Sequence, residues 1–493
     1  MTKALILSDS EANCRDDHHR ELVDGHAEFS DFSERSRARG SRSEHVFLSR
    51  LFAELERGNI RYAVMRNYES LPYGVEGSDL DILVAPDSEQ RSREVLLRVI
   101  ETLGAVAIGL AATVGFFKVY VLGPPLSPHG GWWGLRVDVN VGLSFKGAPL
   151  VGNAVLNACQ KYNDTYVLQA WLAGVLGVLK DILQNNSLPE RYLEAAREAV
   201  RSDWVAVKQV LEPMGAKALA ALRKVIIEGH AGANIRPLCS DIRRHVTWHS
   251  LRRRPQQFVR LRILSEWSKI RRCFNPPGIM VAILGTDGVG KSTMIDAIRP
   301  VLEEATHNAL FTYHLRPSLL PALARLKGVK GTAGVPVPNP HGSRPSGRIG
   351  SLFRLTYHIL DYFLGYWLEV RPRIARQPAI VLFDRYAYDM ALDPRRFRIG
   401  LPRGLIWWFT RFAPRPDIII CLYGDPAIVT SRKRELPVRE VKRQTIELIR
   451  FVEHEPRAVA VSTEGTVEQA RDSILTVLKA ALAARESNER SAT

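Results

Sequence analysis

The sequence predicts an α/β protein in two main parts: a doubly wound parallel sheet in the C-terminal part, preceded by an α+β domain. Three observations lead to this prediction. After Pro276-Pro277, five short apolar segments alternate with helical spacings, as in a parallel sheet with crossover helices. A glycine-rich turn directly follows the first of these segments. In the N-terminal part, apolar segments at 62–65, 80–84 and 135–139 precede long helical stretches from about 151 to 229.

Length and composition limit the class of protein. The chain has 493 residues, of which 46% are hydrophobic and 24% charged, so it can bury the cores of more than one domain. Its five cysteines form no CxxC or Cys/His spacing, which excludes a disulfide framework or zinc site of known pattern and favours a reducing, cytoplasmic setting. No apolar run is long enough for a signal-peptide core or a membrane span.

Composition shifts along the chain predict five segments. Residues 1–44 are expected to be a flexible polar leader, and 45–235 an α+β domain with a helical C-terminal part. A basic linker of one or two helices is expected over 236–275. Residues 276–485 are expected to hold the parallel sheet, and 486–493 a tail. The stretch 327–350 is rich in Gly, Pro and Ser, which predicts a long loop.

The glycine-rich turn predicts a phosphate site. An apolar strand over 279–284 leads into a GxxxxGK[ST] pattern, and a helical pattern follows, which is the context that this motif requires. Its backbone N–H groups would surround phosphate oxygens, with Lys291 at the terminal phosphates and the Ser292 hydroxyl on Mg²⁺. ATP and Mg²⁺ are therefore the expected cofactors. The candidate binding residues are Gly285, Thr286, Asp287, Gly288, Val289, Gly290, Lys291, Ser292 and Thr293.

A second acidic strand supports phosphoryl transfer. Residues 380–383 are apolar and Asp384 follows, which brings a carboxylate to the edge of a parallel sheet where ligands bind. Arg385 comes next and can hold a phosphoryl oxygen through its planar guanidinium. Arg432 and Arg434 lie in a basic run where small-molecule kinases have a closing lid. The candidate catalytic residues are Lys291, Asp384, Arg385, Arg432 and Arg434.

Residues 278 to about 485 resemble the thymidylate kinase branch of the nucleoside monophosphate kinases. The resemblance rests on the loop from Gly285 to Thr293, on the Asp384-Arg385-Tyr386 triplet, and on residues 417–434 with their Asp-Pro turn. It implies that Asp287 leans toward the acceptor, that Asp384 serves Mg²⁺ or the accepting oxygen, and that Arg385 holds the acceptor phosphate. The candidate acceptor contacts are Asp287, Arg316, Arg385, Tyr386, Arg395 and Arg396.

Two departures from that family bear on the acceptor. Thymidylate kinases carry Arg-Glu-Pro-Gly after the second strand, whereas this chain has His314-Leu-Arg-Pro317. The tract from Asp384 to Arg396 is longer and more aromatic, and it resembles thymidylate-kinase-like proteins of bacterial surface-polysaccharide gene regions. The resemblance therefore implies a small nucleotide or sugar-type acceptor, with thymidylate itself not specified.

The N-terminal part carries three candidate metal ligands. Asp79 and Asp81 alternate along one strand, so both point to the same side, and Asp138 on another strand can join them. This arrangement resembles the minimal nucleotidyltransferase core over about 60–140. That family has a Gly-Gly or Gly-Ser pair before the two acids, where this chain has Met65-Arg66-Asn67. The alternatives are nucleotidyl transfer and a domain that only binds a nucleotide, a sugar phosphate or a protein.

The net charge leaves the choice of partner open. The chain has 68 Lys and Arg against 52 Asp and Glu, a net charge of +16. Residues 243–272 hold ten basic residues and one acid, Glu266, with apolar residues interleaved. The first hypothesis is an ATP-dependent kinase with a small acceptor. The alternatives are a nucleic-acid binding or end-processing enzyme, which the charge distribution disfavours, and a non-catalytic nucleotide-binding protein. Two further partners stay open: an anionic membrane, through peripheral contact of 243–272, and a second copy of the chain in a homodimer.

Overall fold

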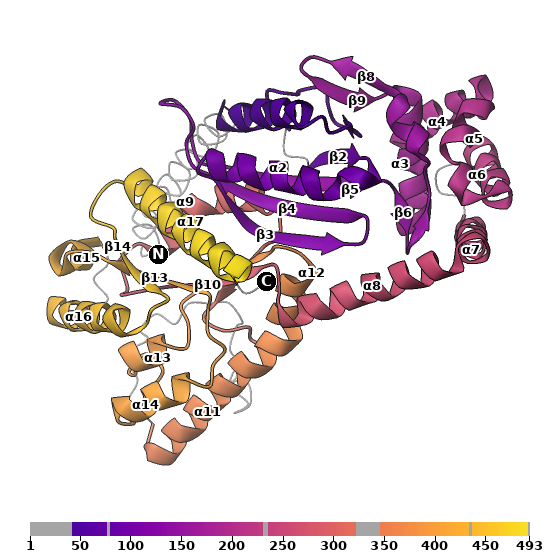
Figure 1. Cartoon of the computed structure of the whole chain (residues 1–493). Helices are drawn as coiled ribbons and strands as arrows, with labels where there is room; N and C mark the ends of the chain where they lie inside the picture. Colours follow the sequence, from indigo (N-terminus) through magenta and orange to yellow (C-terminus); the bar gives the residue numbers. More distant parts are fainter. Residues whose placement is uncertain (1–41, 76–78, 230–234, 322–345, 433–435, 492–493) are drawn as a thin grey trace, which may run out of the picture.

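The computed structural model describes residues 42–75, 79–229, 235–321, 346–432 and 436–491 (Figure 1). Most of the expected leader and of the 327–350 loop lies outside these residues. Residues 42–44 open a helix over 42–57, whose side chains Phe47, Leu48, Leu51 and Phe52 are buried. At the other end, the last helix continues to Ser491, through most of the segment expected to be a tail.

The first sheet has seven strands in the order β3-β4-β5-β2-β1-β9-β8. Pairs β2–β5 and β1–β9 are parallel, and the other pairs are antiparallel. The strands are β1 (Tyr62–Val64), β2 (Leu80–Val84), β3 (Val106–Thr113), β4 (Phe116–Gly123), β5 (Trp133–Val141), β8 (Cys159–Tyr162) and β9 (Thr165–Leu168). The prediction was right for β1, β2 and β5. It was wrong over 159–168, where β8 and β9 form a hairpin with Asn163 at a positive φ in its two-residue turn, and β9 pairs with β1 in place of the expected helix.

Helices complete the N-terminal part. They are η1 (Pro86–Ser88), α2 (Glu89–Thr102), η2 (Asn153–Asn157), α3 (Ala170–Gln184), α4 (Glu190–Ser202), α5 (Trp204–Val210), η3 (Glu212–Met214), α6 (Ala216–Glu228), α7 (Arg236–Arg253) and α8 (Pro255–Phe274), with a small ribbon of β6 (Ser144–Phe145) and β7 (Ala148–Pro149). The basic segment is thus two helices. Cys239, Ile242 and Val246 of α7 are buried in the same core as α3–α6, whereas no residue of α8 is fully buried.

The second sheet has five strands, all parallel, in the order β11-β12-β10-β13-β14. They are β10 (Ile279–Gly285), β11 (Leu310–His314), β12 (Ile380–Asp384), β13 (Ile418–Tyr423) and β14 (Ala458–Ser462), at the predicted places. The helices are α9 (Lys291–Ala305), α11 (Arg348–Gly365), the π-helical η4 (Tyr366–Val370), α12 (Arg371–Arg376), α13 (Asp389–Leu392), α14 (Arg403–Thr410), α15 (Pro426–Arg432), α16 (Val438–His454) and α17 (Val467–Ser491).

Alternate side chains of β10 enter different cores, as a doubly wound sheet requires. Ile279, Val281 and Ile283 pack with α9 and α17, whereas Met280 and Leu284 pack with α11–α14. The predicted architecture of a parallel sheet with helices on both faces is therefore confirmed.

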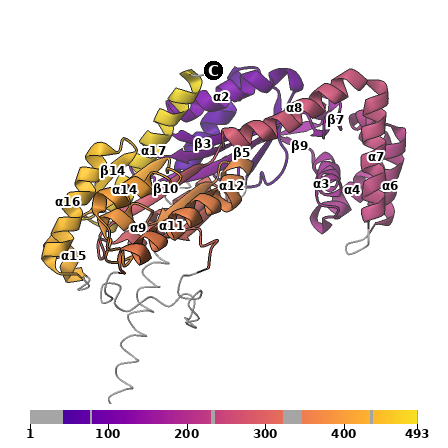
Figure 2. The same ribbon diagram turned by 90° about the horizontal axis from the view of Figure 1, so that it is seen from below.

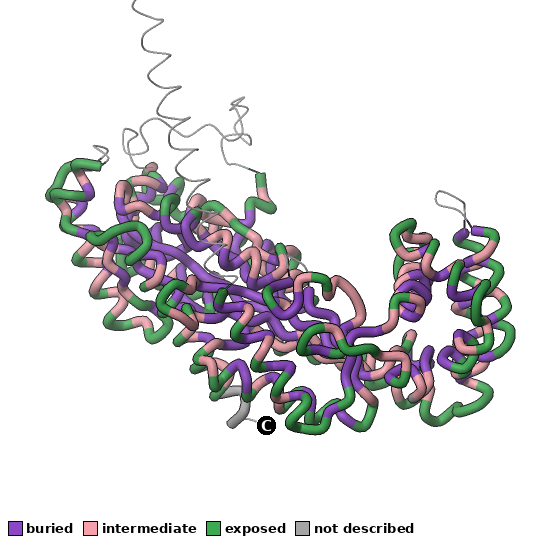
Figure 3. The backbone as a smooth tube through the Cα atoms, turned by 90° about the horizontal axis from the view of Figure 1, so that it is seen from above, coloured by how far each residue is buried: buried purple, intermediate pink, exposed green. Residues whose placement is uncertain are grey.

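The two sheets share one core. Val106, Tyr120 and Leu122 of the first sheet belong to the same buried cluster as α9 and α17, which lie between the sheets (Figure 1). A Cβ at Gly134 of β5 would overlap the backbone of Ala305, so helix α9 approaches β5 as closely as a glycine permits. Buried backbone runs continuously through both sheets (Figure 3). Among the described residues, no helix combines the length and apolar character needed to cross a bilayer.

Candidate functional site

The glycine-rich turn joins β10 to α9 in the geometry of a phosphate site. Gly285, Gly288 and Gly290 all have positive φ, of 157°, 84° and 94°. At Gly285 a Cβ would also meet the backbone of the neighbouring strand β13, so glycine is required there. Helix α9 begins at Lys291, directly after the turn, so its free N–H groups and dipole point to the same place.

Lys291 lies folded back on this turn. Its Nζ donates hydrogen bonds to the carbonyl oxygens of Gly285 and Thr286, at 2.8 and 2.7 Å, and the side chain is buried. Burial, together with the nearby charge of Arg385, lowers the pKa of Lys291 to about 7. An incoming phosphate would replace the two carbonyls as its partner and would favour the protonated amine.

Asp384 stands at the edge of the sheet between two neighbouring strands. Its register partners are Ile283 of β10 and His314 of β11. His314 Nδ1 lies 3.0 Å from Asp384 Oδ2. Burial opposes ionisation of Asp384, but the His314 hydrogen bond and the charge of Lys291 outweigh it and lower the pKa of Asp384.

The residues beside the turn fit a divalent cation. Asp384 Oδ1 is buried and has no hydrogen-bond partner among the described residues, and Ser292 is exposed at the first turn of α9. A carboxylate and a hydroxyl at a phosphate site are oxygen ligands of the kind that Mg²⁺ takes. These two residues could therefore hold the ion that the sequence predicts.

A buried group of charges connects the turn to the segment after β12. Arg385, with φ of 74°, donates from Nη2 to Asp287 Oδ1. Its Nη1 lies 3.4 Å from Asp389 Oδ1. Arg396 donates to the other oxygen of Asp287. Asp389 also accepts a hydrogen bond from the backbone N–H of Tyr386 at 2.9 Å, and burial raises the pKa of Asp389. The structure thus brings together three predicted acceptor residues, Asp287, Arg385 and Arg396.

The side chains of the other predicted acceptor residues have different surroundings. Tyr386 is buried in the core with its hydroxyl on the carbonyl of Pro414, so it supports the segment from inside. Arg316 pairs with the buried Asp361 at 2.8 Å. Arg395 is exposed. The predicted lid is only partly described: Arg432 donates toward the carbonyl of Thr463 at 3.4 Å, and Arg434 lies outside the described residues.

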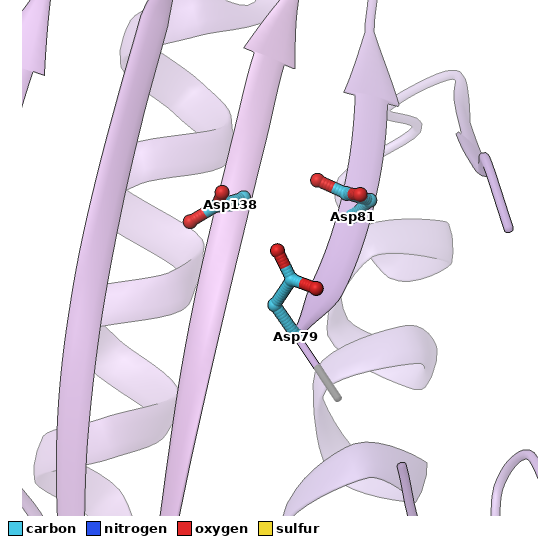
Figure 4. Close-up of side chains that lie close together, drawn as sticks. All are labelled: Asp79, Asp81 and Asp138. Atoms are coloured by element: carbon cyan, nitrogen blue, oxygen red, sulfur yellow. The ribbon is translucent and has the colours of Figure 1, made fainter. Parts of the chain in front are cut away.

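The three acids of the first sheet also converge. Asp81 of β2 and Asp138 of β5 are register partners on parallel strands, and Asp79 precedes β2 (Figure 4). One ligand oxygen from each of the three lies within 4.8 Å of the others, and all three side chains are buried. We call these three residues the acid cluster.

Cations already neutralise the acid cluster. Arg66 donates to Asp81 and lies 3.4 Å from Asp79, and Arg136 donates to Asp138 at 2.8 Å. Lys180 Nζ lies 3.9 Å from Asp81. Burial raises the pKa of Asp81, whereas at Asp79 the charges of the two arginines outweigh burial and lower the pKa.

The acid cluster fits a metal ion poorly while these arginines stay in place. Asp81 Oδ1 is a buried oxygen without a hydrogen-bond partner among the described residues, as a metal ligand would be. The remaining carboxylate oxygens are held by Arg66 and Arg136, so a divalent cation would have to displace at least one guanidinium. The metal site predicted at Asp79, Asp81 and Asp138 therefore has its ligands together but its charge already balanced.

Several residues of these sites were not predicted. His314 ends β11 beside Asp384. Both residues end strands of the predicted parallel sheet, and this pattern could have indicated that they lie side by side if the two strands are neighbours. Asp389 lies in the tract from Asp384 to Arg396, but its pairing with Arg385 follows from the turn after β12. Arg66 stands where a glycine pair was expected, and Arg136 alternates with Asp138, so both could have been read as neutralising partners.

The comparisons with known proteins reach part of the chain. No family model matches it. Thymidylate kinase of Xanthomonas campestris pv. campestris (strain B100) is 27% identical over 159 residues, which cover 32% of this chain and 62% of that enzyme. The chain thus spans less than two thirds of that relative. A probable thymidylate kinase of Staphylothermus marinus is 26% identical over 172 residues, covering 35% of this chain and 76% of the relative.

A solved thymidylate kinase from Ehrlichia chaffeensis also matches, with 16% identity and a TM-score of 0.28, over 41% of this chain and 100% of the other. The sequence relatives show a weak, distant similarity to thymidylate kinases over about a third of the chain. This supports a nucleotide kinase at a coarse level, and it gives no support to the nucleotidyltransferase resemblance.

Proposed function

We propose that residues 276–485 form an ATP- and Mg²⁺-dependent phosphotransferase that moves the γ-phosphoryl group to a small nucleotide or sugar-type acceptor. The observation that carries the proposal is the convergence of three groups at one sheet edge: the turn with Lys291, the carboxylate of Asp384, and Arg385 bound to Asp287. The distant similarity to thymidylate kinases supports it at a coarser level. The surface-polysaccharide setting is part of the proposal and rests on the resemblance of the 384–396 tract.

Each residue has a distinct role in the proposed reaction. The backbone N–H groups of the turn hold the phosphates, and Lys291 leaves the Gly285 and Thr286 carbonyls to bind terminal phosphate oxygens. Asp384 and Ser292 would hold Mg²⁺, which when bound neutralises charge on the phosphates. Arg385 exchanges part of its contact with Asp287 for an anionic group of the acceptor.

The acceptor would lie on the side of Asp287. Two arginines hold that carboxylate, and both are charge-assisted donors that an acceptor phosphate or hydroxyl could share. In-line transfer needs little covalent chemistry from the protein and depends mainly on position and charge. This arrangement favours transfer to an acceptor that is itself anionic.

The test is a phosphoryl-transfer screen with labelled ATP and the full chain. Nucleoside monophosphates, sugars and sugar phosphates, and polyprenyl acceptors are offered in turn to the wild type and to Lys291→Ala and Asp384→Asn. The matched control is Lys208→Ala, an exposed lysine of α5. We expect transfer to one acceptor class by the wild type and control, and its loss in both site variants. Transfer that survives in Lys291→Ala would refute the assignment of this turn.

Nucleotidyl transfer by the first sheet is a second candidate, favoured by the buried Asp81 Oδ1, which has no hydrogen-bond partner in the described part of the chain. It requires Arg66 to leave the acid cluster. Incorporation of α-labelled nucleotide that is lost in Asp81→Asn but retained in Lys291→Ala would support this second activity independently of the kinase.

A further inference from the structure

Helix α8 carries an apolar stripe on its outer side. The stripe residues recur at intervals of four, four, three and four, so at about 100° per residue they fall within roughly 80° of one another around the helix. They are Val259, Ile263, Trp267, Ile270 and Phe274, and all are exposed. Ile263, Trp267 and Phe274 keep 63%, 62% and 74% of their surface in solvent. No described part of the chain covers this stripe.

The opposite side of α8 rests on the protein. Phe258 and Leu261 lie against Gly147, where an added Cβ would touch them, and Arg272 donates to the carbonyl of Ala112 at 3.3 Å. The helix is therefore held in place, and the stripe is turned outward by contacts on its other face.

The end of α8 is fastened to the second sheet's helices. Arg371 of α12 donates to the carbonyls of Cys273 and Phe274, at 2.9 and 2.6 Å. The same guanidinium lies 5.7 Å from the ring centre of Trp367, which is itself half exposed. Helices α8, α12 and α11 follow one another along one side of the molecule in both views (Figures 1 and 2). Arg371 thus brings the half-exposed Trp367 near the C-terminal end of α8.

Basic side chains border the stripe on both sides. Arg260 and Arg271 fall on one border, and Arg262 and Lys269 on the other, by the same helical spacing. Glu266 is the single acid of α8, and Lys269 pairs with it at 2.8 Å. Arg260 and Arg271 make no ion pair within the described residues, and both are exposed. The surface thus combines an aliphatic and aromatic centre with a cationic border.

We propose that this face of α8 docks on the surface of a bilayer that contains anionic phospholipid, with the helix lying in the plane of the interface. An apolar stripe with Trp and Phe would enter the headgroup–acyl boundary, and the arginines would meet lipid phosphates. A second copy of the chain would bring the same cationic border against this one, which is unfavourable. Single-stranded nucleic acid would use stacking rings, whereas valine and isoleucine make up most of this stripe.

The test is vesicle flotation of the full-length protein with phosphatidylcholine alone and with added phosphatidylglycerol. The stripe variant is Ile263→Ser/Trp267→Ser, and its control is Val205→Ser/Ile446→Ser, at exposed apolar positions elsewhere. The charge variant is Arg260→Gln/Arg271→Gln, and its control is Arg93→Gln/Arg98→Gln on α2, which removes equal charge. Because all these residues are exposed, circular dichroism should be unchanged in every variant.

We expect the wild type to float with the acidic vesicles and much less with the neutral ones. The charge variant should lose roughly 10- to 30-fold in partitioning, about fivefold for each arginine near an anionic surface. The stripe variant should lose at least as much, and both controls should float as the wild type does. Flotation that is absent, or equal for wild type and stripe variant, would overturn the proposal.

Two other results would assign the face to a different occupant and so overturn it. One is a lipid-free dimer that the stripe variant converts to a monomer, measured by light scattering. The other is binding to a mixed-sequence oligonucleotide that both variants abolish while flotation is unchanged.

Discussion

Replacing Arg385 by methionine should lower the free energy of unfolding by about 3–5 kcal/mol. The Arg385 side chain is 7% exposed and lies between Asp287 and Asp389. Without it, Asp287 keeps Arg396, but Asp389 loses its ion-pair partner and stays buried. Removing one partner of a buried pair costs about 3–5 kcal/mol. Because Asp287 remains paired, we expect the cost to come mainly from Asp389.

A second substitution separates this structural cost from function. Asp389→Asn removes the uncompensated charge and leaves an oxygen that can still accept the N–H of Tyr386. The double variant Arg385→Met/Asp389→Asn should therefore recover most of the lost free energy of unfolding. If Arg385 holds the acceptor as proposed, the double variant will fold but remain inactive in phosphoryl transfer.

The pH dependence gives a further check on this account. Burial already raises the pKa of Asp389, and loss of the guanidinium should raise it further. An acid with a raised pKa in the folded state contributes stability below that pKa and loses it as the pH rises. The deficit of Arg385→Met should accordingly be largest near neutral pH and shrink on acidification.

The assay is urea unfolding of wild type, single and double variants between pH 5 and 8, followed by circular dichroism. A single variant as stable as the wild type would refute the reasoning. So would a double variant no more stable than the single one, because Asp389 would then not be the source of the cost.

The remaining predictions concern Lys291, Asp384, the acid cluster and Gly134. The affinity for ATP should fall by up to tenfold per pH unit above about 7, because the lowered pKa of Lys291 leaves its amine neutral there. Titration calorimetry measures this affinity, and in Lys291→Met the affinity should not depend on pH in this way. Without nucleotide, the same lowered pKa should make the protein more stable as the pH rises from about 7 to 10.5. Asp384→Asn should abolish the strengthening of ATP binding by Mg²⁺, and an unchanged Mg²⁺ effect would contradict the proposed site. Arg66→Met should bind Mn²⁺ at the acid cluster at least tenfold more tightly than the wild type does, as measured by electron paramagnetic resonance. The substitution removes a positive charge at contact distance from the ion, and that repulsion is worth more than about 1.4 kcal/mol. Gly134→Val should lower the free energy of unfolding by about 1–3 kcal/mol through overpacking, whereas Gly404→Ala, which meets no atom and lies in the first turn of α14, should leave it equal or slightly higher.

Local patterns predicted much of the second sheet. All five of its strands lie where the apolar segments indicated, and Asp384 stands beside the glycine-rich turn because parallel strands carry their C-terminal ends to one edge. The acids of the first sheet also converge, since Asp79 and Asp81 alternate along one strand and Asp138 lies in register with Asp81.

Long-range pairing accounts for what the sequence did not predict. Alternation along β5 places Arg136 on the face of Asp138, but Arg66 follows β1 and meets Asp81 only because β1 pairs with β2. The hairpin over 159–168 depends on pairing of β9 with β1, more than a hundred residues earlier. Tyr386 resembles a site residue by its neighbours in sequence, but its ring packs between Phe383 and Tyr362 in the core.

The position of α9 decides how the two candidate sites can cooperate. The helix begins at Lys291 in the phosphate turn and ends at Ala305 against Gly134 of β5, the strand that also carries Asp138. Its 15 residues span roughly 22 Å at 1.5 Å per residue. Since close packing at Gly134 leaves no room for α9 to slide, a phosphate held at Lys291 stays about a helix length from the contact between Ala305 and Gly134. Any coupling between the phosphate turn and the acid cluster would therefore pass through the shared core around α9.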